Sequence, residues 1–202
     1  MLDNIKSKVI LNNIFNLLEK RIKLKVAKYN KKIKDKLNIK LKDFMFFKLI
    51  KDFNKKFNTK IKHTDEIELV LDNCNIPNSG LRYLAQIPFT YLKKLILSNN
   101  NISNIGTIIP SNFNFDNLEI LSFEQNHIKD LSILTKANFK KLKLLNLDHN
   151  NLSDMKIFSQ IKSPILETLI LNGNQISDLT FLSEMTFYYL KELILSRNTI
   201  KT

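Results

Sequence analysis

One eleven-residue pattern recurs six times along residues 66–202, and it constrains the fold of this chain more than any other feature. In the clearest copy the repeated positions are Leu92, Leu95, Leu97, Asn100 and Ile102. The same positions return in copies that start at residues 118, 142, 166 and 190, and an earlier copy starts at Glu66. Successive copies start 24 or 26 residues apart. A period of this length is typical of stacked repeats, in which each unit buries its apolar face only against its neighbours.

Each copy contains two leucine-type residues separated by one other residue, which predicts a strand with one buried face. Six such strands, stacked in parallel about 4.8 Å apart, would share one continuous apolar core. An asparagine, or a cysteine in the first copy, follows the strand where the chain turns. We expect its side chain to bond to backbone groups of its own and the neighbouring turn. The predicted ladder consists of Cys74, Asn100, Asn126, Asn150, Asn174 and Asn198.

The pattern resembles the leucine-rich repeat, L-x-x-L-x-L-x-x-N/C-x-L. Its return segments, such as residues 128–131 and 176–179, are similar to the short intracellular class of these repeats. The resemblance implies an α/β solenoid, an arc with a parallel sheet on its concave face and short helical or 3₁₀ turns on its convex side. We expect about six repeats in residues 63–202, the last one incomplete. Its end at Thr202, without a polar cap, predicts a longer natural product, a covering partner or second copy, or a fragment.

Phenylalanines three residues before four of the copies are expected to fill the core on the convex side. They are Phe89, Phe115, Phe139 and Phe187.

The residues that alternate with the leucines are expected to face the concave side, where this class of solenoid offers a surface to a partner protein. The candidate partner-binding residues are Val70, Asp72, Ile96, Ser98, Ser122, Glu124, Asn146, Asp148, His149, Ile170, Asn172, Ile194 and Arg197. This mixture of aliphatic, acidic and amide groups suits a protein better than a phosphate. Glu124 and Asp148 occupy the same column of adjacent strands. They are either a docking point for a Lys or Arg, or two solvated carboxylates.

Chemistry-bearing motifs are absent from the sequence. There is no nucleophile elbow, no zincin helix and no glycine-rich phosphate loop. The single cysteine, Cys74, can form neither an internal disulfide nor a multi-cysteine zinc site. His127 and His149 lie near the two carboxylates without the spacing of metal ligands. We therefore expect no enzymatic activity, no cofactor and no metal.

No stretch near the N-terminus is long and apolar enough for a signal peptide or a membrane span. We expect an intracellular protein of the cytoplasm or the nucleus.

Residues 1–62 form a different region, predicted to be helical and basic. Residues 1–63 hold 19 Lys and Arg against 5 Asp and Glu, whereas residues 64–202 hold 13 against 14. The whole formal charge of +13 therefore belongs to the N-terminal third. Phe46, Ile50, Phe53 and Phe57 follow one helical stripe, which predicts a helix that caps the first leucine layer.

Residues 10–18 resemble the opening of the F-box, Ile-Leu-x-x-Ile-Phe-x-x-Leu, although its usual Leu-Pro start is Lys6-Ser7 here. The resemblance implies docking on a Skp-type adaptor of a ubiquitin ligase, whose substrate the repeats would select. The implied docking residues are Ile10, Leu11, Ile14, Phe15 and Leu18. A plain helical hairpin, or a lysine-rich surface for nucleic acid or anionic membrane, remains open for this region. The repeat subtype also leaves open a regulatory subunit of an enzyme such as a phosphatase.

Overall fold

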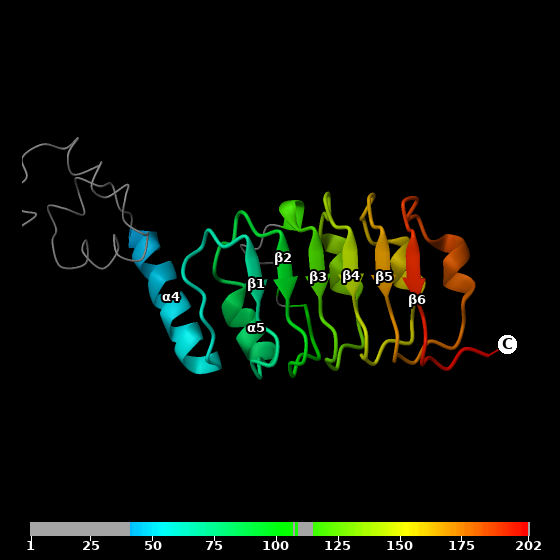
Figure 1. The fold of residues 1–202 in the computed structure, drawn as a ribbon, viewed down its shortest axis with the longest axis horizontal. Coiled ribbons are helices and arrows are strands. Elements are labelled where there is room, and N and C mark those ends of the chain that lie inside the picture. The colour runs from blue at the N-terminus through cyan, green and yellow to red at the C-terminus, as the bar shows by residue number, and fades with distance from the viewer. Residues whose placement is uncertain (1–40, 107, 109–114, 202) are drawn as a thin grey trace, which may run out of the picture.

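The computed structural model describes residues 41–106, 108 and 115–201. Six parallel strands form one open sheet in the order β1-β2-β3-β4-β5-β6, so each repeat pairs with the next along the chain (Figure 1). The strands are β1 (Glu68–Val70), β2 (Lys94–Ile96), β3 (Ile120–Ser122), β4 (Leu144–Asn146), β5 (Thr168–Ile170) and β6 (Glu192–Ile194). This sequential stacking confirms the α/β solenoid.

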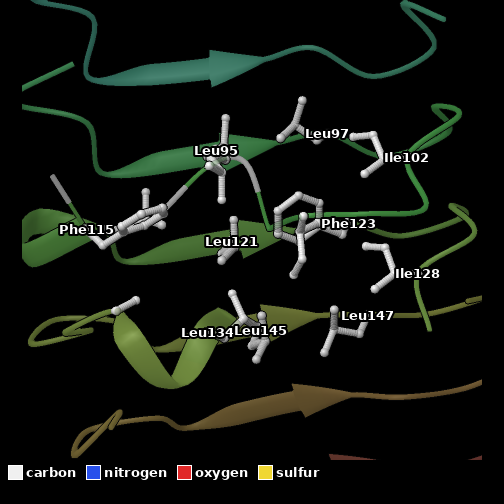
Figure 2. Close-up of a cluster of buried hydrophobic side chains, with 14 of the residues drawn as sticks. Leu95, Leu97, Ile102, Phe115, Leu121, Phe123, Ile128, Leu134, Leu145 and Leu147 are labelled. Atoms are coloured by element: carbon white, nitrogen blue, oxygen red, sulfur yellow. The ribbon is translucent and has the colours of Figure 1, made fainter. Parts of the chain in front are cut away.

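The central residue of every strand is a leucine, and these leucines are paired in register across the whole sheet. The column runs Leu69, Leu95, Leu121, Leu145, Leu169 and Leu193. The first five are buried, and Leu193 in β6 is half-buried. A second buried column follows two residues later, as at Leu97, Phe123 and Leu147 (Figure 2). The alternation predicted from the sequence therefore places one apolar face of the sheet in a continuous core.

The phenylalanine column fills the core as predicted, with one gap in the fifth repeat. Phe89, Phe115, Phe139 and Phe187 are all buried. Ser163 occupies the position in the fifth copy and is also buried. Phe158, from the preceding 3₁₀ turn, lies with its ring centroid 6.1 Å from that of Phe187 and supplies aromatic volume there.

A short 3₁₀ turn lies between each pair of consecutive strands from β2 to β6. These turns are η2 (Phe115–Asn117), η3 (Ser132–Lys136), η4 (Lys156–Ser159) and η5 (Thr180–Glu184). The first repeat differs, since it returns through the α-helix α5 (Asn78–Leu84). Length alone does not explain the helix, since the next repeat is equally long and returns through η2, whereas α5 has a second helix to pack against. With seven residues, α5 is a short helical turn of the kind expected on the convex side.

Helix α4 (Leu41–Phe57) covers the N-terminal end of the core. Ile50, Phe53 and Phe57 on its predicted stripe are buried. The Phe53 ring lies 4.7 Å from that of Phe57 and 6.2 Å from that of Tyr83 in α5. A Cβ atom on Gly80 would lie 2.6 Å from Phe57 Cζ, so the close approach of the two helices requires glycine at that position.

The F-box-like stretch at residues 10–18 lies outside the described residues. Of the α-helices that the structure describes, neither is long and apolar enough to cross a membrane.

Candidate functional site

The sheet presents one face to the core and leaves the other uncovered by the helical elements. Buried residues of α5 and of the 3₁₀ turns, such as Leu84 and Phe158, join the same cluster as the strand leucines, so these elements pack on the core side. We call the opposite side, which the sequence predicts to be concave, the open face. It has three rows of side chains, each crossing all six strands.

The entrance row of the open face is formed by the first residue of each strand. Its members are Glu68, Lys94, Ile120, Leu144, Thr168 and Glu192. The middle row is Val70, Ile96, Ser122, Asn146, Ile170 and Ile194. The exit row, two residues later, is Asp72, Ser98, Glu124, Asp148, Asn172 and Ser196.

Sequence reasoning found the middle and exit rows and missed the entrance row. The missed signal is simple, because the period of two extends one step before the first leucine of each strand. The omission matters at β3 and β4, where the entrance row holds Ile120 and Leu144, both half-buried.

Aliphatic side chains, one on each strand, form a path across the open face, which we call the aliphatic track. On β1, β2, β5 and β6 it follows the middle row, and on β3 and β4 it shifts to the entrance row. Its residues are Val70, Ile96, Ile120, Leu144, Ile170 and Ile194. Where the track changes rows, side chains are diagonal neighbours about 7–8 Å apart, which is within reach for isoleucine. Val70 is 55 % exposed and the others are half-buried.

Two serines that were expected on the binding surface are buried instead. Ser98 and Ser122 are only 7 % and 3 % exposed, and their Oγ atoms lie 2.9 Å apart in a hydrogen bond. Their short side chains lie below the level of the larger neighbours, and each hydroxyl satisfies the other. They therefore support the face without being available to a partner.

Polar side chains beside the track form a connected group on β3 and β4, which we call the polar centre: Glu124, Asn146, Asp148 and His149. Asn146 Nδ2 donates to Glu124 Oε2 at 3.0 Å, and Asn146 Oδ1 accepts from the Asp148 N–H at 2.9 Å. Asp148 Oδ1 lies 2.8 Å from His149 Nδ1. The backbones are adjacent as well, since the Gln125 N–H donates to Asp148 O. Within the described chain, Glu124 Oε1 and Asp148 Oδ2 accept no hydrogen bond, so each carboxylate is held by one oxygen and offers the other.

The chain turns sharply just after the exit row. All six residues at this position have positive φ: Asn73, Asn99, Gln125, His149, Gly173 and Arg197. The His149 ring lies over Gly173, where a Cβ atom would be 2.8 Å from His149 Cδ2. The candidate residues His149 and Arg197 therefore lie on the rim of the open face, at the turn.

The residues just before the entrance row, which we call the entrance rim, carry charges of alternating sign. They are Lys93, Glu119, Lys143, Glu167 and Lys191. Lys93 Nζ lies 3.2 Å from Glu119 Oε1, and Lys191 Nζ lies 2.8 Å from Glu167 Oε2. The hydrogen bond and charge of Lys191, with a contribution from Lys143, hold the pKa of Glu167 below its usual value. This rim is therefore close to neutral, in contrast to the carboxylates on the exit side.

The asparagine ladder joins each repeat to the one before it. The Ile76 N–H donates to Asn100 Oδ1 at 2.8 Å, while Asn100 Nδ2 donates to Leu71 O and to Leu97 O, both at 2.9 Å. The same arrangement recurs at Asn126, Asn150, Asn174 and Asn198. Each amide therefore bonds to backbone groups in two consecutive repeats.

Cys74 starts the ladder and makes a smaller contribution. Its Sγ lies 3.3 Å from Asp72 O in its own turn. Burial, and then the charge of Asp72, raises the pKa of the thiol. A thiol whose pKa is raised is a poorer nucleophile at neutral pH, which agrees with a structural role.

Among the residues that the structure describes, no three or more His, Cys, Asp and Glu side chains are grouped to hold a metal ion. The open face thus offers an aliphatic track, preorganised carboxylates and hydrogen-bonding amides. These are groups for binding another molecule.

A family model described as "Leucine Rich Repeat" matches residues 91–115, which contain β2 and the turn after it. Over these residues the chain is similar to the leucine-rich-repeat family. No curated protein sequence matches the chain.

Solved structures of leucine-rich-repeat proteins from Listeria monocytogenes are similar to it. Internalin C2 is 18 % identical, with a TM-score of 0.45, over 76 % of this chain and 85 % of that one. The functional domain of InlJ, described as including a cysteine ladder, is 21 % identical, with a TM-score of 0.34, over 67 % of this chain. The match spans 36 % of the InlJ chain.

Proposed function

We propose that this protein binds another protein through the open face of its leucine-rich-repeat sheet. The observation that carries this proposal is the aliphatic track, which crosses all six strands and is covered by no element of the described chain. Apolar surface of this kind, bordered by polar side chains, is typical of protein-interaction sites. The asparagine ladder hydrogen-bonds consecutive repeats to each other, which should hold the face in one shape and lower the entropic cost of binding.

The test is a comparison of proteins captured from an extract of the source cells. Leu144→Asp places a charge in the middle of the track and should abolish capture of the specific partner. Tyr188→Asp is the matched control, because Tyr188 is 86 % exposed and lies outside the open face. A partner that is retained equally by both variants would contradict binding through this face.

A narrower role as a substrate receptor of a ubiquitin ligase is supported by the F-box-like sequence at residues 10–18. It predicts co-purification with a Skp-type adaptor that is lost when Ile14 and Phe15 are both replaced by alanine. Absence of the adaptor from preparations of the unmutated protein would refute this role.

The basic charge of residues 1–63 supports a second candidate, binding of nucleic acid or an anionic membrane. This binding should weaken steeply as salt is raised, and it should be unchanged by Leu144→Asp. Equal affinity at low and high salt would argue against it.

A further inference from the structure

The open face also indicates what kind of partner it fits. We infer that its occupant is an amphipathic α-helix of the partner protein, with a stripe of aliphatic residues bordered on one side by Arg or Lys. This inference rests on the proposed function and narrows it to one class of ligand. Three observations carry it: the spacing of the track, its length, and the charges on its two sides.

The spacing of the track matches a helix better than an extended chain. Neighbouring strands of the sheet lie about 4.8 Å apart, so the track advances across the sheet by roughly that interval per strand, with diagonal steps of about 7–8 Å from β2 to β3 and from β4 to β5. On a helix, residues three and four apart succeed one another on one face at about 5.4 Å, the helical pitch. Along an extended segment, residues on one face repeat at about 6.6–6.8 Å, so they fall out of step with the strands after two or three contacts.

The length of the track sets the length of the helix. Six strands span about 24 Å between β1 and β6 at the usual strand spacing. At about 1.5 Å per residue, a helix of about 16 residues covers that distance. Ile120 and Leu144 lie near the middle, where the track shifts toward the entrance row and leaves the polar centre on its other side.

The charges on the two sides of the track differ, which gives the helix its orientation. On the exit side, Glu124 and Asp148 each present one carboxylate oxygen that accepts no hydrogen bond within the described chain. No Lys or Arg lies on the rows of β3, β4 or β5. On the entrance side, Lys93 pairs with Glu119 and Lys191 with Glu167, so that rim has no comparable excess of negative charge. A stripe of Arg or Lys along the exit side of the bound helix therefore complements the face.

The rest of the chain works against nonspecific binding of a basic ligand. The full protein carries a net charge of +13, so long-range electrostatics favour an acidic peptide over a basic one. A preference for the basic peptide must consequently come from a local site. This makes the charge of the ligand an informative variable in a test on the full-length chain.

The test uses three synthetic peptides of about 16 residues with the full-length protein at about 150 mM salt, followed by fluorescence anisotropy. The first peptide is helical, with a leucine stripe bordered by arginines. The second replaces the arginines by glutamates, and the third keeps the composition of the first with two central prolines. We expect the first to bind at least tenfold more tightly than either of the others.

Protein variants locate the site on the open face. Glu124→Gln combined with Asp148→Asn should weaken binding of the arginine peptide at least tenfold. Asp52→Asn combined with Glu184→Gln removes the same charge from exposed positions away from the face and should change affinity less than twofold. Thermal unfolding of each variant verifies that the fold is retained.

Any of three results would overturn the inference. The glutamate peptide could bind as tightly as the arginine peptide, the proline peptide could do so, or no peptide could bind at concentrations up to about 1 mM. These outcomes are distinct from failure of the proposed function. If a partner is still captured in a manner sensitive to Leu144→Asp, the face binds protein in another form. If capture is insensitive as well, both are wrong.

Discussion

At the scale of single residues, the ladder asparagines occupy positions at which the side chain must hydrogen-bond to buried backbone groups. Asn150 Oδ1 accepts from the Ile128 N–H at 3.0 Å, and Asn150 Nδ2 donates to Phe123 O at 2.9 Å. These backbone groups are remote from water, because both residues are buried. An unpaired buried backbone group is costly, so the identity of this side chain matters more than its size.

We predict that Asn150→Ala lowers the free energy of unfolding by about 1–3 kcal/mol, because it leaves the buried Ile128 N–H without its partner, whereas Phe123 O keeps the bond from Asn126 Nδ2. Asn151→Ala is the matched control. The Asn151 side chain makes no ladder hydrogen bond, so this substitution should lower the free energy of unfolding by under about 0.5 kcal/mol. Urea unfolding followed by circular dichroism measures both. Similar losses in the two variants would mean that the ladder contributes little.

Asp178 lies two residues before the 3₁₀ turn η5 and has a pKa below its ordinary value of 3.8. The main cause is the hydrogen bond from Thr180 Oγ1, at 2.7 Å, followed by the bond from the Thr180 N–H. A lowered pKa in the folded state means that the ionised carboxylate favours folding above the unfolded pKa. That contribution is lost as the pH falls through the folded pKa.

We predict that Thr180→Ala raises the pKa of Asp178 toward 3.8, because it removes the stronger of the two bonds and keeps the backbone one. Carbon-detected NMR titration of the carboxyl group reports the change. Ser183→Ala is the control, since the Ser183 hydroxyl donates to Thr180 O and not to Asp178. A pKa unchanged by Thr180→Ala would assign the shift to the backbone instead.

At the scale of the strand, neighbouring residues have opposite roles. In β4, Leu145 is fully buried in the core, while Leu144 belongs to the aliphatic track and is half-buried on the open face. In every repeat the central leucine of the strand faces the core and its two neighbours face the open side, and this leucine is buried in β1 to β5. The protein can therefore vary its binding face without altering its core.

We predict that Leu145→Ala costs about 3 kcal/mol of stability, because it opens a cavity in the core. Leu144→Ala should lower the free energy of unfolding by under about 1 kcal/mol. It should weaken partner binding, whereas Leu145→Ala should not do so at a temperature at which that variant is folded. Thermal unfolding and capture of the partner together measure the two effects. Equal destabilisation by both substitutions would contradict the separation of the two faces.

At the scale of the whole molecule, stability is built from neighbouring pairs of repeats, because each repeat contacts mainly the next one. The N-terminal end is closed by α4, whose Phe53 is fully buried against Phe57 and Tyr83. Loss of this cap should therefore be felt most strongly by the nearest repeat.

We predict that Phe53→Ala lowers local stability by about 3–5 kcal/mol. Hydrogen exchange should show loss of protection in α5 and β1, with much smaller changes in β5. Met45→Ala, at a position 57 % exposed on the same helix, should leave exchange unchanged. A uniform loss of protection along the solenoid would indicate one cooperative unit.

The net charge of the whole chain indicates a class of partner only when it is calculated separately for the N-terminal region and for the repeats. Residues 1–63 carry a net charge of +14, from 19 Lys and Arg against 5 Asp and Glu, whereas the repeats in residues 64–202 carry −1. Their surface carries a local excess of carboxylate at the polar centre and paired charges at the entrance rim. Charge therefore argues for nucleic acid only in the N-terminal region.

The sequence by itself determined the repeat, the strand leucines, the ladder and the capping stripe of α4. These features follow from periodicity within one repeat and recur in each copy, so local chemistry is sufficient to predict them. Tertiary structure decided the burial of Ser98 and Ser122, the path of the aliphatic track and the carboxylate oxygens that remain free. Each of these depends on which side chain lies beside it in the next strand, and how far that side chain reaches. Neither property can be read from one repeat alone.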